Sequence, residues 1–145
     1  MKNRKRGFSL VELLIVLAVI AALIATITPV AMNAIRKSQA TKVAQNLKTL
    51  ASAFENYVYV NSGAPDDFSD LGRDINKEKY NALYETDNGA YTVTIITSES
   101  VHTPTVEEVL KGAKFETYSG DTTGTLNGEF TGDVTIWYQY SFESY

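Results

Sequence analysis

The chain begins with one long apolar run, whose pattern differs from everything that follows. Residues 8–30 read FSLVELLIVLAVIAALIATITPV and hold a single charged residue, Glu12. As a helix this run would be roughly 35 Å long, which is enough to cross the hydrocarbon core of a bilayer with some tilt. The run therefore predicts a membrane-spanning helix.

Residues 31–60 stay helical in pattern but become amphipathic. Apolar residues recur at intervals of four, three, four and three, which is the spacing of one helix face: Val43, Leu47, Leu50, Phe54 and Tyr57. We therefore expect a single helix from Phe8 to about Val60, whose second half packs one face on a globular head. The turn-forming sequence Asn61–Pro65 should end this helix.

Residues 61–145 have the pattern of a small antiparallel sheet. Four segments are rich in β-branched and aromatic residues: Ala90–Thr97, Ala113–Tyr118, Gly124–Thr131 and Asp133–Phe142. Residues 66–88 form a predicted loop, which could include a short helix around Lys77–Tyr84. Thr105–Glu108 has the form of a capping box, so a short helix should begin there and end at Gly112. The predicted fold class is α+β, with a long N-terminal helix packed against this sheet.

The residue inventory excludes several kinds of site. The chain has no Cys and one His, His102, which excludes disulfides, thiolate metal sites, a cysteine nucleophile and multi-histidine metal sites. The serine and threonine residues lie in no nucleophile motif, and no glycine-rich phosphate loop is present. We therefore expect a protein that is not an enzyme, with His102 in a loop.

Charge is distributed unevenly along the chain. Residues 1–7 hold four Lys or Arg and no acid, whereas residues 61–145 hold five Lys or Arg and 15 Asp or Glu. The positive-inside rule places the basic leader in the cytoplasm and the residues after the apolar run outside it. The formal net charge of −4 argues against a general nucleic-acid binder.

Two ordinary explanations of the apolar run fit incompletely. A secretory signal peptide has a shorter apolar region that ends at an A-x-A-like site, and residues 8–30 contain no two alanines at i and i+2. A plain single-pass anchor explains the length and the orientation but not Glu12. A carboxylate within a membrane segment costs about 2.5–3.5 kcal/mol on insertion scales, so Glu12 points to a function.

The start of the apolar run resembles the class III signal of type IV pilins and pseudopilins. Gly7-Phe8-Ser9-Leu10-Val11-Glu12 follows a short basic leader. The family motif is a glycine, then a hydrophobic residue that is usually Phe, with a glutamate at the fifth position counted from it. Pro29 falls where these proteins usually carry a proline. The resemblance covers residues 1 to about 60 and implies the pilin fold.

The resemblance implies four segments. Residues 1–7 would be a cleaved leader, residues 8–30 the transmembrane and filament-core helix, residues 31–60 its amphipathic continuation, and residues 61–145 the head. A prepilin peptidase would cut between Gly7 and Phe8, because a residue without a side chain allows close approach to the backbone, and would usually N-methylate Phe8. The mature chain would hold nine Lys or Arg and 17 Asp or Glu.

The resemblance also gives Glu12 and Pro29 roles in a filament. Glu12 of one subunit would pair with the free amino group of Phe8 on a neighbour and so set the axial register. A protonated Glu12, or one that reaches the cytoplasmic interface, would equally explain this residue in an unassembled subunit. Pro29 should kink or loosen the helix, and Thr26 and Thr28 can satisfy the carbonyl groups that it frees.

One acidic cluster is a weak candidate for a metal site. Asp66, Asp67, Asp70 and Asp74 lie close together in sequence. Calcium takes several oxygen ligands, and some pseudopilins use it. The spacing is not that of an EF-hand, and aspartate also favours turns. We therefore expect a solvated acidic loop and no cofactor, with calcium as the alternative.

The expected function is structural. The chain would be a subunit of a type IV pilus or pilus-like filament, a homo-oligomer whose partners are the prepilin peptidase, an inner-membrane assembly platform and its ATPase. The precursor would lie in the inner or plasma membrane with its head outside the cytoplasm, and the mature protein in an extracellular or periplasmic filament. Adhesion, twitching motility, DNA uptake and secretion stay open as roles. A type II secretion pseudopilin is the alternative, and a monomeric membrane-anchored binding domain is a further one.

Overall fold

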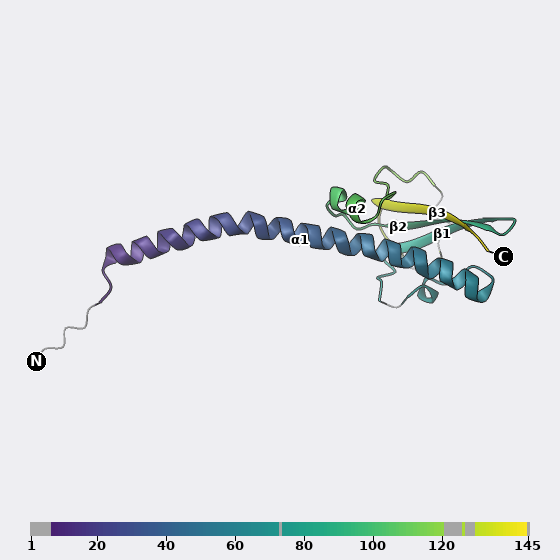
Figure 1. The fold of residues 1–145 in the computed structure, drawn as a ribbon, viewed down its shortest axis with the longest axis horizontal. Helices are drawn as coiled ribbons and strands as arrows, with labels where there is room; N and C mark the ends of the chain where they lie inside the picture. The colour runs from purple at the N-terminus through teal and green to yellow at the C-terminus, as the bar shows by residue number, and fades with distance from the viewer. Residues whose placement is uncertain (1–6, 73, 121–125, 127–129, 145) are drawn as a thin grey trace, which may run out of the picture. The chain divides into compact units, whose positions relative to one another are not determined.

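A computed structural model of the chain describes residues 7–72, 74–120, 126 and 130–144 (Figure 1). In chain order, its elements are α1 (Leu10–Asn61), the short 3-10 helix η1 (Phe68–Asp70), β1 (Tyr80–Asp87), β2 (Ala90–Thr97), α2 (Thr103–Val109) and β3 (Ile136–Glu143). This is the predicted α+β arrangement, in which a long N-terminal helix packs against a small antiparallel sheet. The chain divides into two compact units, Met1–Arg36 and Lys37–Tyr145, and α1 contributes to both.

The second part of α1 supplies one wall of the head's core. Its buried residues form one face of the helix: Ala40, Val43, Ala44, Leu47, Leu50, Ala51, Phe54 and Val58. The predicted face is confirmed except at its end, where Tyr57 is half-buried and Val58 is fully buried. The 3.6-residue period explains this shift, because Val58 lies one turn beyond Phe54 whereas Tyr57 lies at the margin of the stripe.

The end of α1 uses a residue in the left-handed conformation. Ser62 has a φ of 55°, and its N–H donates to the carbonyl oxygen of Val58 at 2.8 Å. The side-chain amide of Asn61 donates to the carbonyl oxygen of Tyr57 at 3.0 Å. Both bonds satisfy carbonyl groups that a helix end leaves without a partner. The turn predicted at residues 61–65 is therefore confirmed.

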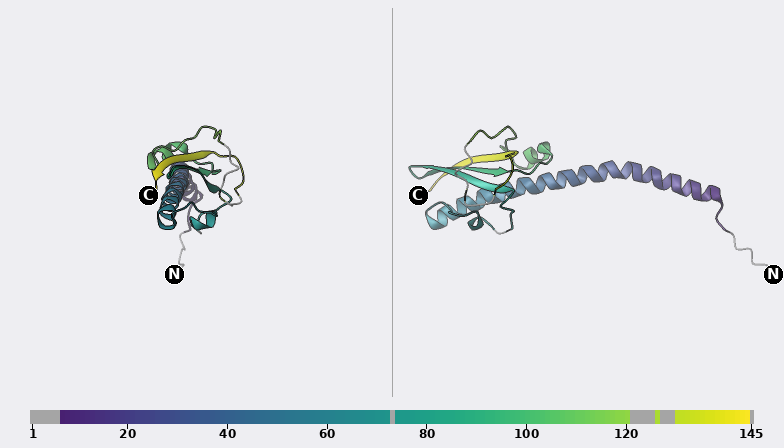
Figure 2. Two further views of the ribbon diagram at one scale, coloured as in Figure 1. Left: turned by 90° about the vertical axis from the view of Figure 1, so that its right-hand side faces the viewer. Right: turned by 180° about the vertical axis from the view of Figure 1, so that it is seen from behind.

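The sheet in the described part of the chain has three antiparallel strands in the order β1-β2-β3. The register pairs Asp87 with Ala90 across the first hairpin and Ala90 with Glu143 on the other side. α1 lies along one face of the sheet (Figure 2). The ring centroid of Phe54 lies 5.5 Å from that of Tyr84 on β1 and 6.5 Å from that of Tyr91 on β2.

The strand β1 corrects the prediction for residues 66–88. The expected short helix at Lys77–Tyr84 is wrong, because this segment leads into a strand that runs from Tyr80 to Asp87. The first four residues of β1 are buried and the last four are exposed, so burial along β1 does not alternate as it does in a half-buried strand. A turn signal was nevertheless present. Asn88 and Gly89 have φ values of 49° and 87°, the conformation that an Asn-Gly hairpin turn requires.

The structure confirms some of the other predicted strands and not others. Ala90–Thr97 is confirmed with its exact bounds as β2, and the predicted Asp133–Phe142 begins later, at Ile136. Ala113–Tyr118 is not a strand, since it makes only a single isolated bridge, between Lys114 and Trp137. Most of Gly124–Thr131 lies outside the described residues. Of its described members, Leu126 donates its N–H to the carbonyl oxygen of Ala82 at 3.2 Å.

The short helix α2 begins earlier than predicted. His102 occupies the N-cap position and Pro104 lies in the first turn, where the fixed φ of proline suits a helix start. Thr105, expected to open a capping box, instead lies inside the helix, and its hydroxyl is 2.8 Å from Nδ1 of His102. The helix ends at Val109 rather than at Gly112, which has a φ of 97°.

Tyr140 ties the last strand to the helix. Its ring stacks between those of Tyr138 and Phe142 on the helix-facing side of β3, with centroid separations of 5.7 and 6.0 Å. Its hydroxyl donates to the carbonyl oxygen of Ala51 in α1 at 2.6 Å. Burial, with a smaller contribution from the carboxylate of Glu55, raises the pKa of the Tyr140 hydroxyl above its usual value. The folded head therefore favours the neutral phenol that makes this bond.

We predict that Tyr140→Phe lowers the free energy of unfolding by about 1 kcal/mol, because one intramolecular hydrogen bond is lost while the ring stays in place. Chemical unfolding of the full chain in detergent, followed by near-ultraviolet circular dichroism, measures this change. Tyr138→Phe is the matched control, since the described residues offer its hydroxyl no hydrogen-bond partner. Equal stability of the Tyr140→Phe variant and the wild type would contradict the prediction.

Candidate processing and assembly site

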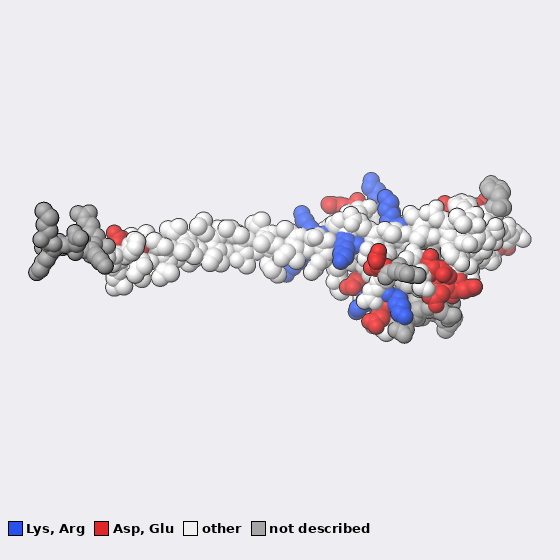
Figure 3. Space-filling model, turned by 90° about the horizontal axis from the view of Figure 1, so that it is seen from below, with Lys and Arg blue, Asp and Glu red and all other residues white. Residues whose placement is uncertain are grey.

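The first part of α1 has an apolar surface that the described chain leaves uncovered. Every large apolar side chain from Leu10 to Ile35 is between 46% and 74% exposed. By length and composition, α1 can cross a membrane, and none of its most apolar stretch is buried within the described residues. The space-filling view shows this stretch as white, with red near its start (Figure 3). Exposed leucine, isoleucine and valine over this length require a lipid or protein environment.

The start of α1 is fixed by a reciprocal pair of hydrogen bonds between Ser9 and Glu12. The Ser9 N–H donates to Oε2 of Glu12 at 2.9 Å, and the Glu12 N–H donates to the hydroxyl oxygen of Ser9 at 3.2 Å. This is a capping box, which satisfies two backbone N–H groups at a helix start. The carboxylate also lies at the positive end of the helix dipole. Glu12 therefore has a local role in a single subunit, beside the role predicted for it in a filament.

Gly7 and Phe8 precede the helix and are open to approach. Phe8 is 86% exposed. A Cβ built at Gly7 would meet no atom within 4 Å, and Gly7 has no left-handed φ. The chain itself therefore gives no steric reason for glycine at this position. If glycine is required there, the requirement comes from a partner that approaches the backbone.

The helix continues through Pro29 without a break in its assignment. Thr26 donates its hydroxyl to the carbonyl oxygen of Leu23 at 2.9 Å, and Thr28 donates to that of Ile24 at 2.7 Å. Proline at position 29 frees the carbonyl group four residues earlier, that of Ala25. We had expected the two threonines to satisfy the freed carbonyl group. They bond to the carbonyl groups of Leu23 and Ile24 instead. The predicted kink at Pro29 stays a prediction.

Comparison with protein families now identifies this segment. A family model described as the prokaryotic N-terminal methylation motif matches residues 2–28. The chain carries the class III signal of type IV pilins and pseudopilins. No curated protein and no solved structure matches it. The matched motif and the long apolar helix support a type IV pilin-like precursor with a membrane anchor.

Two aspartates of the acidic loop make hydrogen bonds that hold the local structure of the head. Asp67 accepts hydrogen bonds from the N–H and the hydroxyl of Ser69 at 2.8 and 2.7 Å, and Asp70 accepts one from the N–H of Asp67 at 3.3 Å. The two bonds from Ser69 hold the pKa of the Asp67 carboxyl below its usual value. Asp67 and Asp70 therefore cap η1, while Asp66 and Asp74 are exposed. No group of three or more metal-binding side chains gathers among the described residues.

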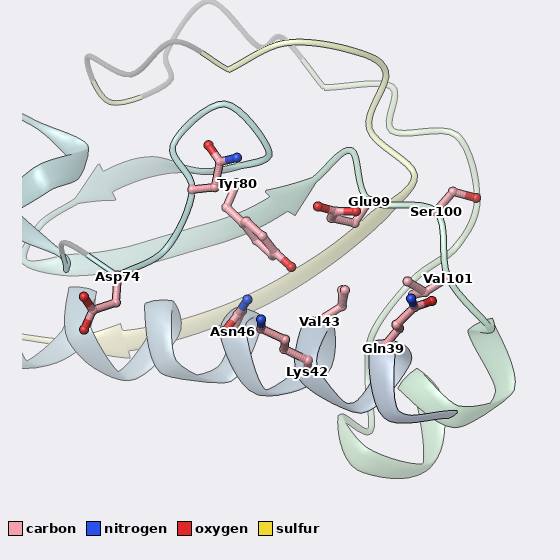
Figure 4. Close-up of a pocket in the computed structure, with 10 residues that line it drawn as sticks. Gln39, Lys42, Val43, Asn46, Asp74, Tyr80, Glu99, Ser100 and Val101 are labelled. Carbon is pink, nitrogen blue, oxygen red and sulfur yellow. The ribbon is translucent and has the colours of Figure 1, made fainter. Parts of the chain in front are cut away.

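A polar hollow lies between α1 and the loops that flank the sheet (Figure 4). Its volume is about 370 Å³, and Lys42, Asn46, Asp74, Tyr80 and Glu99 are among the residues that line it. Burial raises the pKa of the Tyr80 hydroxyl above its usual value. The hollow mixes both signs of charge around a neutral phenol, and this lining marks no defined ligand. His102 lies apart from it, at the start of α2.

Sequence reasoning missed Ser9 as a functional residue, although the signal was readable. Ser9 and Glu12 have the S-x-x-E spacing of a capping box and stand directly before an apolar run. The class III motif requires the glutamate and not the serine, so the motif by itself assigns no role to Ser9. The structure assigns Ser9 to the helix start, where it positions the Glu12 carboxylate.

We predict that Ser9→Ala speeds hydrogen exchange of the Glu12 amide about fivefold in detergent micelles, because an N-cap hydrogen bond contributes about 1 kcal/mol. Ser9→Thr is the control and should exchange like the wild type, since threonine also serves as an N-cap. Amide exchange resolved by nuclear magnetic resonance measures the effect. Unchanged exchange in Ser9→Ala would mean that the capping box does not hold the helix start.

Proposed function

We propose that this chain is the structural subunit of a type IV pilus or a closely related filament. The precursor is stored in the membrane through α1. The peptidase cuts between Gly7 and Phe8, and an assembly machine then polymerises the mature subunit through its apolar helix. The chain performs no catalysis in this scheme and takes no cofactor. Its partners are other copies of itself, the peptidase, an assembly platform and an ATPase.

The observation that carries the proposal is the exposed apolar surface from Leu10 to Ile35, which directly follows the class III signal. When the helix leaves the bilayer, its apolar side chains must stay shielded from water. Bundled copies of the same helix can provide that shielding. The apolar residues surround the helix on all sides, so each copy can contact several neighbours.

Glu12 supplies the register in this scheme. Cleavage creates a free amino group at Phe8, four residues before Glu12 in the sequence. Within a helix bundle an unpaired carboxylate is costly, and so is an unpaired ammonium group, whereas the two together neutralise each other. An incoming subunit is therefore stabilised most when its Glu12 lies at the same axial position as the Phe8 amino group of a neighbour. Pro29 can loosen the helix where neighbouring helices pack.

The proposal applies equally to a pilus and to a type II secretion pseudopilus. Both require the same signal, the same apolar helix and the same head outside the cytoplasm. The mature subunit would then lie in an extracellular or periplasmic filament, where adhesion, twitching motility, DNA uptake or secretion could be its use.

We predict that Gly7→Val leaves the leader attached, because the branched side chain blocks approach to the scissile backbone. Intact-mass analysis of the membrane fraction should show a wild-type chain that begins at Phe8, with or without one methyl group, and a variant that begins at Met1. Gly63→Val is the matched control, since a Cβ at Gly63 also meets no atom within 4 Å. A Gly7→Val variant that begins at Phe8 would contradict the cleavage assignment.

We predict that Glu12→Ala and Glu12→Gln both enter the membrane and are processed, yet give at least tenfold less sheared surface filament than the wild type. The glutamine variant separates two roles of Glu12. Its side-chain oxygen can still accept the bond from the Ser9 N–H, but it carries no charge to pair with Phe8. Wild-type amounts of filament from Glu12→Gln would show that capping alone is needed, and the pairing mechanism would then be wrong.

A further inference from the structure

Two cations stand where the apolar surface of α1 ends. Arg36 and Lys37 directly follow Ile35, and both are exposed. In the space-filling view, the first blue side chains appear where the white stretch ends (Figure 3). Along α1 no Asp or Glu occurs between Glu12 and Glu55, so no carboxylate has the spacing of one turn that pairs charges on a helix. The helix itself therefore neutralises neither cation.

The length of the apolar surface places these cations at the level of lipid headgroups. From Leu10 to Arg36 the helix rises about 39 Å, at 1.5 Å per residue. A bilayer is about 30 Å thick in its hydrocarbon core and about 40–45 Å with its headgroup layers. With Leu10 at the cytoplasmic edge of the hydrocarbon, the Cα atom of Arg36 lies about 9 Å beyond the opposite edge, which is the outer part of the headgroup layer.

The direction of the side chains brings both charges back toward the phosphate groups. In an α-helix each Cα–Cβ bond tilts toward the N-terminus, which for α1 is the membrane side. Arginine and lysine also have long stems that lie along apolar surface while the charged end stays at the interface. Arg36 and Lys37 leave the helix about 100° apart. Because headgroups surround the helix on all sides at one level, both directions lead to phosphate groups.

We propose that Arg36 and Lys37 bind phosphate groups of lipids in the leaflet on the head's side of the membrane, and so fix the depth of the subunit. The partner is the lipid surface itself. A guanidinium group pairs with phosphate through two parallel hydrogen bonds, and lysine binds phosphate as a point charge. Anionic lipids add a general attraction for basic residues next to a membrane helix. The inference needs only that α1 spans a membrane, so it goes beyond the proposed filament subunit.

The depth of the subunit needs a fixed point because the apolar surface is longer than the hydrocarbon core. A helix with such an excess tilts and draws its extra residues into the lipid. In α1 the residues in excess are 30–35, and the head's core begins soon after them, at Ala40. Arg36 and Lys37 oppose this movement, because a charged side chain is costly in hydrocarbon. They therefore keep residues 30–35 at the headgroup level and the head outside the bilayer.

The first test looks for the phosphate group directly. The full chain has four arginines, Arg4, Arg6, Arg36 and Arg73, and Arg4→Lys with Arg6→Lys keeps the leader charge and leaves two. This chain, with carbon-13 in its guanidinium groups, is placed in bilayers of phosphatidylethanolamine and phosphatidylglycerol. The buffer is free of phosphate, so lipid is the only source of phosphorus. Carbon–phosphorus solid-state nuclear magnetic resonance should show an attenuated guanidinium signal, and adding Arg36→Lys should abolish the attenuation.

The second test measures the depth of the helix. The chain has no cysteine, so Asn33→Cys adds a single thiol just before the cations. In this background Arg36→Gln with Lys37→Gln should slow alkylation by a water-soluble maleimide about fivefold in nanodiscs of the same lipids, because the thiol sinks toward the hydrocarbon. The matched control is Lys42→Gln with Lys48→Gln, which removes two charges about 9 and 18 Å further along α1. It should react within about twofold of the parent chain.

Three results would overturn the inference. One is attenuation of the guanidinium signal that is the same with and without Arg36. Another is unchanged alkylation in Arg36→Gln with Lys37→Gln, or an equal change in the control, which would show an effect of total charge. A third is an effect seen only at high protein-to-lipid ratio, which would assign the cations to carboxylates of a neighbouring copy. These results leave the proposed filament intact, since cleavage at Phe8 and the Glu12 variants test it separately. A chain that does not enter the bilayer would remove both.

Discussion

The constraint on which the rest of this structure depends is the apolar surface between Leu10 and Ile35. A large aliphatic side chain gains about 1.5–3 kcal/mol when it moves from water into an apolar environment, and none of these side chains is buried within the described chain. The first part of α1 therefore has no stable state in water as an isolated subunit. Lipid covers it before assembly, and in the proposed filament other copies of the helix replace the lipid. The head needs its own core, since it cannot draw on this surface.

That core is built from the same helix, and the change in pattern along α1 makes this possible. From Leu13 to Ala25 the helix is apolar on all sides, and beyond Lys37 only one stripe is buried. Residues such as Phe54 and Val58 pack on the sheet, and Tyr140 binds the helix backbone directly. A single continuous helix thus serves two environments, because its polar positions begin where the head begins.

Much of this fold could be predicted from the sequence, for physical reasons that differ between elements. The second part of α1 follows from a period of 3.6, which reflects one buried face. β2 follows from its content of β-branched residues, although its residues from Val93 to Thr97 are all buried. β1 has no comparable run of β-branched residues, and its burial does not alternate, since Tyr80–Leu83 are buried and Tyr84–Asp87 are exposed. The clearest sequence signal for this strand is the Asn88-Gly89 hairpin turn that follows it. Segments near Lys114 and Leu126 are held to the sheet by single bridges or bonds, which periodicity cannot reveal.

The candidate site also has residues that the sequence predicts and one whose role it does not. Gly7, Phe8 and Glu12 follow from a motif, while the role of Ser9 needed the hydrogen bonds of the helix start. The capping box also affects how processing works. Both of its members lie downstream of the Gly7–Phe8 bond, and α1 begins at Leu10. Cutting that bond would break neither hydrogen bond of the capping box, so in the proposed maturation the subunit changes its charge and keeps the start of its helix.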